Sequence, residues 1–180
     1  TLDKIRLYEA VLRKWQKKLN LVAPDTLQSL WARHFLDSHQ VALAASGASG
    51  HWVDLGSGGG FPGLYCAIVT HQARSGTTFE LIESDTRKCA FLREVARQTD
   101  TPVQISNVRV EATEPRDAEV IAARALAPLQ TLLPLVARHL SPHGTALLQK
   151  GASHAVELET VRDDWQMSVE IEPSLTAPES

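Results

Sequence analysis

A short apolar segment that runs into a cluster of glycines constrains the fold of this chain more than any other stretch. It reads WVDLGSGGGFPG (residues 52–63), in which residues 52–55 are typical of a buried strand and Pro62 of the first turn of a helix. The glycines between them leave almost bare backbone, which tolerates positive φ and presents amide groups at a helix N-terminus. The order strand, glycine loop, helix therefore predicts an α/β fold whose loop contacts a small ligand.

Two motifs compete for these glycines. Read from Gly58, the stretch satisfies G-x-G-x-x-G, the dinucleotide fingerprint, but the first glycine of that motif should follow the strand directly, as Gly56 does here. Counted from Gly56, the third glycine position falls on Phe61, which is too bulky for close helix packing. Read as D-x-G-x-G-x-G from Asp54, the stretch resembles the first motif of S-adenosylmethionine-dependent methyltransferases, whose loop meets the methionine end of the cofactor.

Two charged residues follow later strands of the predicted sheet. Residues 78–82 read as a strand that ends at Glu83, where nucleoside-binding folds hold both ribose hydroxyls with one carboxylate. The alternative interpretation of Glu83 is an ordinary acidic residue before a helix. Residues 119–123 read as a buried parallel strand followed by Arg124, a cation that is out of place in a core and fits a contact to cofactor or substrate.

Apolar periodicity predicts helices first and then alternating strands and helices. Helical patterns cover residues 2–19 and 27–35, a turn is expected at SPHG (141–144), and strands are expected at 52–55, 78–82, 102–106, 119–123, 145–149 and 168–171. This alternation predicts a doubly wound, mostly parallel α/β sheet with a helical extension at its N-terminus. A length of 180 residues suits one core, so we expect a single domain over 1–180, with a helical preface at 1–46 and the sheet core at 51–172.

Composition argues against several classes of protein. No run approaches the ~20 apolar residues of a membrane span and no N-terminal signal is present, so we expect a cytoplasmic protein with no membrane contact. Cys66 and Cys89 lie in apolar helical contexts with unrelated spacing, which predicts core thiols. The seven histidines show no zinc-like spacing, and we expect no metal site.

The charge of −3 is unevenly placed. Residues 157–180 hold seven acids and one base, which leaves 17 bases against 14 acids in residues 1–156. Within residues 4–18 six bases stand against a single acid, Glu9. Such a run is either a solvated helix face or a surface for nucleic acid, and charge alone leaves both interpretations open.

Six segments carry a resemblance to a known family. They are WQKKLNL (15–21), RHFLDS (33–38), VDLGSGGGFPG (53–63), ESDTRKCAFLREVA (83–96), RVE (109–111) and ARA (123–125). With these segments the chain resembles, from its first helix to Lys150, the bacterial small-subunit ribosomal RNA guanine-N7 methyltransferases, the glucose-inhibited division protein B family. The resemblance implies methyl transfer from S-adenosylmethionine to N7 of a guanine. The implied partner is small-subunit ribosomal RNA or an assembling small ribosomal subunit, and we expect a monomer.

The expected cofactor site gathers residues from four loops. It comprises Gly56, Gly58, Phe61, Glu83, Val110, Glu111 and Arg124. Phe61, Val110 and Glu111 are implied only by the resemblance. The two glycines and Phe61 would shape the methionine end of the pocket, Glu83 would bind the ribose, and Val110 with Glu111 would border the adenine.

The segment after the fourth expected strand bears on the chemistry. It reads AARALAPL (122–129), without the Asn/Asp-Pro-Pro-aromatic motif of exocyclic-amine methylation and without a cysteine nucleophile. This favours an atom that is already nucleophilic, such as guanine N7, and we therefore expect no catalytic general base. A methyltransferase acting on a protein or small molecule, and a nucleotide-binding module without catalysis, remain as alternatives; the basic preface favours RNA.

The C-terminal end departs from the expected pattern. Methyltransferase folds of this type usually add a seventh, antiparallel strand, and the sequence stops at Ser180 before one appears. We interpret this either as truncation, which Thr1 in place of a methionine also suggests, or as a missing last strand.

Overall fold

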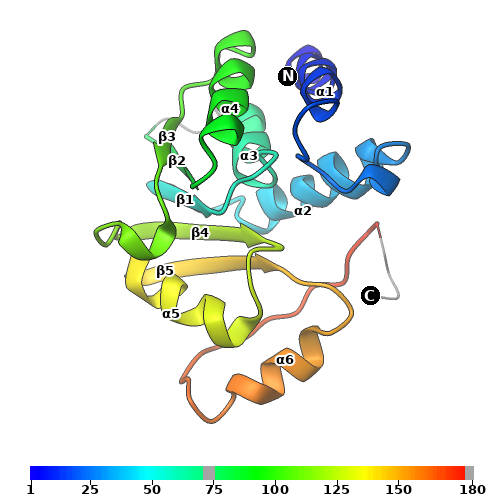
Figure 1. The fold of residues 1–180 in the computed structure, drawn as a ribbon. Coiled ribbons are helices and arrows are strands. Elements are labelled where there is room, and N and C mark those ends of the chain that lie inside the picture. The colour runs from blue at the N-terminus through cyan, green and yellow to red at the C-terminus, as the bar shows by residue number, and fades with distance from the viewer. Residues whose placement is uncertain (71–75, 177–180) are drawn as a thin grey trace.

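The computed structural model describes residues 1–70 and 76–176, so the end at Ser180 lies outside the described residues (Figure 1). The strands are β1 (His51–Leu55), β2 (Thr78–Glu83), β3 (Gln104–Asn107), β4 (Ala118–Arg124) and β5 (Leu140–Gln149). The α-helices are α1 (Leu2–Gln16), α2 (Asp37–Ala44), α3 (Gly63–Thr70), α4 (Thr86–Gln98), α5 (Leu129–His139) and α6 (His154–Val161). Shorter helical turns are Pro24–Thr26, Trp31–Leu36 and Val110–Ala112.

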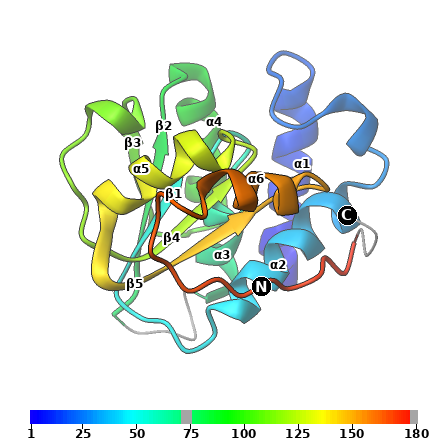
Figure 2. The same cartoon turned by 90° about the horizontal axis from the view of Figure 1, so that it is seen from below.

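The five strands form one parallel sheet in the order β3-β2-β1-β4-β5. Helices α2, α3 and α4 cover one face and α5 covers the other, with α6 beside it (Figures 1 and 2). Both faces are therefore covered, and the central strands are almost continuously buried. The predicted doubly wound α/β fold is confirmed, and every strand that pairs in it is parallel.

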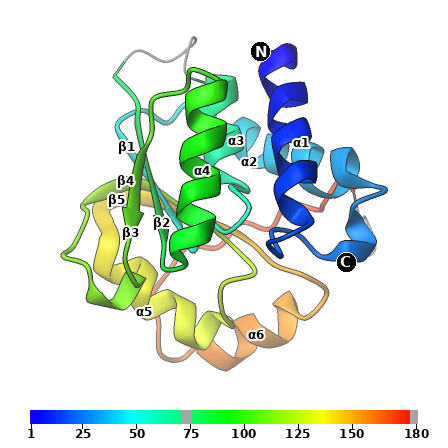
Figure 3. The same ribbon diagram turned by 45° about the horizontal axis from the view of Figure 1, so that its top comes forward.

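Helix α1 lies against the outer side of α4 and runs antiparallel to it (Figure 3). Its buried residues Ile5, Tyr8 and Leu12 recur at the helical period, as the sequence predicts. At the start of α1 the Lys4 ammonium donates to the carbonyl of Asp100, which follows the end of α4, at 2.9 Å. The helical preface is thus packed onto the sheet domain along α1.

Between α1 and α2 the chain forms short turns in place of the regular helix expected over residues 27–35. The Thr26 hydroxyl donates to the Ala23 carbonyl at 2.7 Å and lies 2.7 Å from His34 Nε2. These side-chain bonds fix a 3₁₀ turn, and the chain then passes through a π-helical turn, Trp31–Leu36, into α2. Among the described residues no helix is both long and apolar enough to cross a membrane.

Two expectations about the last strands are wrong. The tetrapeptide 141–144 belongs to β5, because a bulge in the pairing of β4 with β5 accommodates it instead of a turn. Residues 168–171 form no strand in the described structure. Their segment leaves the sheet and follows α2, where Gln40 donates to the Pro173 carbonyl at 3.2 Å and accepts from the Leu175 amide at 2.8 Å. The alternating pattern is present, but its apolar residues Val169 and Ile171 stay exposed, and β5 remains the edge of the sheet in the described residues.

Candidate cofactor site

The register of the sheet brings three of the predicted site residues side by side at its carboxyl edge. At this edge the last pairs that β1 makes place its Leu55 between Ile82 of β2 and Ala123 of β4. Gly56, Glu83 and Arg124 each follow one of them directly. Because the strands are parallel, the three residues meet at the carboxyl edge of the sheet, where open α/β folds bind their ligands.

Glu83 holds the glycine loop against β2. Its Oε2 accepts from the amide of Gly58 at 2.9 Å and its Oε1 accepts from the amide of Asp85 at 2.8 Å. The amides of Gly56 and Ser57 donate to the carbonyl of Ile82 at 2.9 and 3.0 Å. The two predicted elements of the site, the loop and the carboxylate, are therefore in direct contact, with Glu83 only 8% exposed.

Two glycines of the loop, Gly58 and Gly60, differ in what a side chain would meet. Gly58 has φ of +50°, and a Cβ built on it would meet only the Gly56 carbonyl oxygen at 3.8 Å, so the space in front of it is open. Gly60 has φ of +86°, and a Cβ there would overlap the hydroxyl of Tyr8. Gly58 thus leaves room for a ligand, whereas Gly60 leaves room for the protein's own core.

Tyr8 of α1 supports the loop from beneath, and the motifs of the sequence do not identify it. It is fully buried, its hydroxyl donates to the Gly59 carbonyl, and its ring stacks on Phe61 with centroids 5.2 Å apart and planes at 14°. The guanidinium of Arg124 lies over the same Phe61 ring, 5.0 Å from its centroid. Phe61 therefore joins the N-terminal helix to the end of β4. The only signal in the sequence is the place of Tyr8 in the apolar stripe of α1.

Arg124 is held by the helical preface. Its Nη1 lies 3.7 Å from Asp37 Oδ2 and donates to the Arg33 carbonyl at 3.4 Å. Gln149 at the end of β5 donates to the same Asp37 oxygen at 2.7 Å. Burial lowers the pKa of Arg124 while the charge of Asp37 raises it, and an arginine stays protonated at any working pH. Asp37, within the RHFLDS segment, is a second site residue that sequence patterns do not single out.

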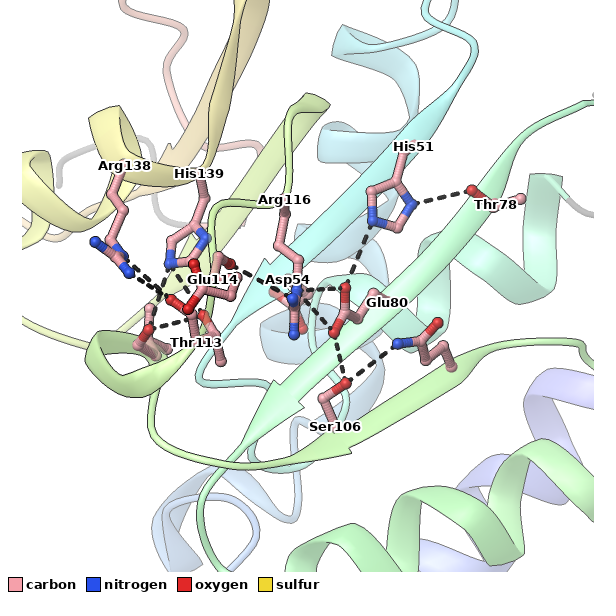
Figure 4. A network of polar contacts seen from close by, with 12 residues as sticks. His51, Asp54, Thr78, Glu80, Ser106, Thr113, Glu114, Arg116, Arg138 and His139 are labelled. Atoms are coloured by element: carbon pink, nitrogen blue, oxygen red, sulfur yellow. Dashed lines mark hydrogen bonds and ion pairs between the residues drawn. The ribbon is translucent and has the colours of Figure 1, made fainter.

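Val110 and Glu111 lie in the helical turn that follows β3, beside the strand that ends at Glu83. Val110 is buried and Glu111 is exposed. The Val110 carbonyl accepts from the Thr113 hydroxyl at 2.9 Å and lies 3.3 Å from His139 Nε2 (Figure 4). The turn is thus fixed from the side of α5 and leaves the Glu111 side chain at the surface. Within the described residues, no hydrogen bond or ion pair joins this turn to the glycine loop.

A second buried carboxylate, Glu80 of β2, belongs to the framework (Figure 4). Burial raises its pKa, but hydrogen bonds from His51 and Ser106 and the charge of Arg116 outweigh burial, so the pKa lies below its ordinary value. Arg116 Nε lies 3.0 Å from Glu80 Oε2. These contacts join β1, β2, β3 and the segment before β4, and they satisfy the charge without any ligand.

The two cysteines are core thiols, as the sequence predicts. Both are fully buried. Cys89 donates to the Glu83 carbonyl at 3.2 Å, and burial raises the pKa of its thiol. A buried thiol with a raised pKa is a poor nucleophile.

Asp54 lies under the glycine loop, and its burial should make the free energy of unfolding depend on pH. It is 2% exposed; its Oδ2 accepts from the Gly63 amide at 3.3 Å, and its Oδ1 has no hydrogen-bond partner in the part of the chain that the structure describes. Burial raises its pKa from 3.8 to about 6, against the opposing effects of hydrogen bonds and of Arg124. Because the folded state prefers the protonated form, the free energy of unfolding should fall as pH rises through this range.

Replacing Asp54 with asparagine should remove the pH-dependent fall in the free energy of unfolding, which amounts to at most about 3 kcal/mol between pH 4 and 7. The measurement is denaturant unfolding of wild type and variant across that range, with exposed Asp25→Asn as control. His34 contributes with the opposite sign, because burial lowers its pKa from 6.5 to about 4 and stability is lost as pH falls. The difference between variant and wild type therefore isolates Asp54, and parallel curves would contradict the assignment.

Comparisons with known proteins agree with this geometry. A family model described as GidB, rRNA small subunit methyltransferase G, matches residues 1–179. Proteins named ribosomal RNA small subunit methyltransferase G are similar over nearly the whole chain. That of Jannaschia sp. (strain CCS1) is 46% identical over 176 residues, 98% of this chain and 83% of the relative. That of Rhodospirillum centenum is 49% identical over 178 residues, 99% and 80% of the two chains.

Solved structures support the fold alone, because their identities are low. The ribosomal protein L11 methylase of Lactobacillus delbrueckii subsp. bulgaricus is similar with a TM-score of 0.58 at 15% identity, over 74% of this chain and 71% of that one. The tRNA (m1A58) methyltransferase TrmI of Aquifex aeolicus gives 0.56 at 14% identity, over 71% and 52%. The family model that matches residues 1–179 and the relatives that are 46% and 49% identical show that the chain belongs to the rRNA small subunit methyltransferase G family.

Proposed function

We propose that this protein transfers a methyl group from S-adenosylmethionine to N7 of a guanine in small-subunit ribosomal RNA. The observation that carries the proposal is the contact between the glycine loop and Glu83 at the carboxyl edge of the sheet, in a chain of this family. The names of the relatives supply ribosomal RNA as the substrate. The proposal includes a monomeric, cytoplasmic, single-domain enzyme that acts on free RNA or on an assembling small subunit.

The residues present fit the cofactor. The open space before Gly58 would allow the methionine end of the cofactor to approach the main chain of the loop. Glu83 is a carboxylate at a strand end, where ribose hydroxyls bind in such folds. Its two present hydrogen bonds come from backbone amides, and each carboxylate oxygen has a further lone pair to offer. Val110 and Glu111, one strand further along the same edge, would border the adenine.

The cofactor supplies an electrophilic methyl group, and the chain's own residues position the two reactants. Guanine N7 carries a lone pair and no proton at neutral pH, so its methylation needs no base. Proximity and orientation can then supply several kcal/mol, up to about 7–11 in the best model systems. Arg124, permanently charged beside Phe61, orients cofactor or guanine and takes no proton.

The single-turnover rate of methylation should be independent of pH from about 6 to 9 when RNA and cofactor are saturating at each pH. Nucleoside mass spectrometry of the product identifies the methylated atom in the same samples. A rate that rises steeply with an apparent pKa near neutrality, and loses this rise on mutation of one His, Asp or Glu, would show a general base and a target other than N7. Methylation of a protein or small molecule in place of RNA, or no transfer at all, would favour the two alternative functions.

A further inference from the structure

Helix α1 packs antiparallel on α4 (Figure 3), so the two ends of α1 lie near opposite edges of the sheet. Lys4 lies by the end of α4, where it donates to the Asp100 carbonyl. Trp15, near the other end of α1, packs on Phe91 with ring centroids 5.9 Å apart. Since α4 starts directly after β2, the end of α1 lies at the carboxyl edge of the sheet and its start lies at the opposite edge.

The end of α1 is also adjacent to the glycine loop. Gln16, the last residue of α1, accepts from the amides of Leu21 and Val22 at 2.9 and 3.1 Å and donates to the Val22 carbonyl at 2.8 Å. A Cβ built on Gly59 would lie 2.9 Å from the Leu21 carbonyl oxygen. The segment that follows α1, which begins at Lys17, therefore rests directly on the cofactor loop through Leu21.

The packing of Trp15 on Phe91 places three lysines near this edge, which we call the edge cluster: Lys17 and Lys18 follow α1, and Lys88 lies in the first turn of α4. Lys88, in the first turn of α4, lies one turn before Phe91 on the face that packs against α1. No ion pair to any of the three is found in residues 1–70 and 76–176. Arg13, further back on α1, is already paired with Glu9 at 2.8 Å, and at the far end of the helix Arg6 lies 3.9 Å from Asp3. The cations that this end of α1 leaves for a phosphate are therefore its lysines.

A groove of about 580 Å³ lies next to the edge cluster. Its lining residues are Arg13, Gln16, Lys17, Pro24 and Leu27. Arg13 is held by Glu9 at 2.8 Å and by the Leu27 carbonyl at 3.2 Å, so Lys17 is the lining cation that suits a phosphate. The apolar surfaces of the proline and the leucine suit the face of a base. Sequence-specific recognition of RNA mostly uses single-stranded nucleotides whose bases are unstacked, because side chains cannot read the deep, narrow major groove of an RNA helix. The groove suits a nucleotide of this kind.

We propose, on the basis of the function proposed above, that the RNA strand crosses the molecule at the carboxyl end of α1. Its phosphates contact the edge cluster, and a nucleotide flanking the target guanine occupies the adjacent groove. The target then lies over the glycine loop, within reach of the methyl group. Lys4 and Arg6, at the other end of the same helix, make no contact with the RNA.

The test compares two charge removals on one helix, Lys17→Gln/Lys18→Gln and the control Lys4→Gln/Arg6→Gln. RNA affinity is measured over a tenfold range of salt concentration. Removing one lysine that binds a phosphate should flatten the log–log slope by about 0.7–0.9, so the slope should fall by roughly 1.4–1.8 in the first variant and stay unchanged in the control. S-adenosylhomocysteine affinity, measured without RNA, should be equal in all three proteins and shows that the variants are folded.

The outcomes separate this proposal from the function on which it rests. If wild type fails to methylate small-subunit RNA, the proposed function is wrong. If wild type methylates RNA but both variants keep the wild-type slope, or both slopes flatten equally, the RNA does not cross at the carboxyl end of α1 and the present proposal is wrong. A flatter slope confined to Lys17→Gln/Lys18→Gln supports it.

Discussion

Replacing Gly60 with alanine is expected to lower the affinity for S-adenosylhomocysteine by about a hundredfold. An alanine at φ of +86° costs about 1–2 kcal/mol, because its Cβ crowds the following carbonyl. The Cβ would also overlap the Tyr8 hydroxyl and meet Leu64 Cβ at 3.0 Å, and overpacking of this kind costs about 1–3 kcal/mol. Together these costs disfavour the native loop by about 3 kcal/mol, which is two orders of magnitude in binding.

Titration calorimetry measures the effect, with nicotinamide dinucleotide as a ligand that should give no heat. Gly47→Ala is the matched control, since Gly47 is exposed and a Cβ there meets nothing within 4 Å. The double variant Gly60→Ala/Tyr8→Phe should recover part of the affinity, because it removes the hydroxyl that the new methyl group overlaps. Wild-type affinity in Gly60→Ala would mean that the loop does not form the cofactor site.

Truncating Arg124 to alanine should impair cofactor binding and turnover together, each by about a hundredfold. The substitution removes the cation over Phe61 and leaves the half-buried Asp37 with uncharged side-chain partners only, Gln149 and Thr176. Losing one member of a half-buried ion pair costs stability by about 2 kcal/mol, less than for a fully buried pair because solvent screens part of the charge. Arg124→Lys keeps the charge but removes the planar group that stacks, so it should restore activity only in part.

Single-turnover rates, calorimetric affinities and denaturant unfolding together measure these effects. The control is Arg162→Ala, an exposed arginine whose ion pair with Glu159 at 3.2 Å lies on α6 and its end, away from the glycine loop. An Arg124→Ala protein with unchanged affinity and unchanged rate would exclude this residue from the site. A variant that unfolds at lower denaturant yet methylates normally would assign Arg124 to stability alone.

The sequence predicts those parts of the site that depend on strand ends. Gly56, Glu83 and Arg124 each follow an apolar run, and parallel strands place the residues after such runs at one edge. Tyr8 and Asp37 could not be assigned in this way, because their contacts join segments about 50 and 90 residues apart and arise only when the preface docks on the sheet. Residues 168–171 carry a strand pattern without a strand, and because Val169 and Ile171 stay exposed, the alternation there does not reflect burial against the sheet.

The stack of Tyr8 on Phe61 makes the docking of α1 and the shape of the cofactor loop a single cooperative event. Two ligands that both favour such a shared state are thermodynamically linked, and each strengthens the other by the same factor. RNA bound at the end of α1 would thus raise the affinity for S-adenosylmethionine, and bound S-adenosylhomocysteine would in turn slow the dissociation of the RNA. Reciprocity of this kind gives the first helix a part in the order of substrate binding and product release as well as in the architecture.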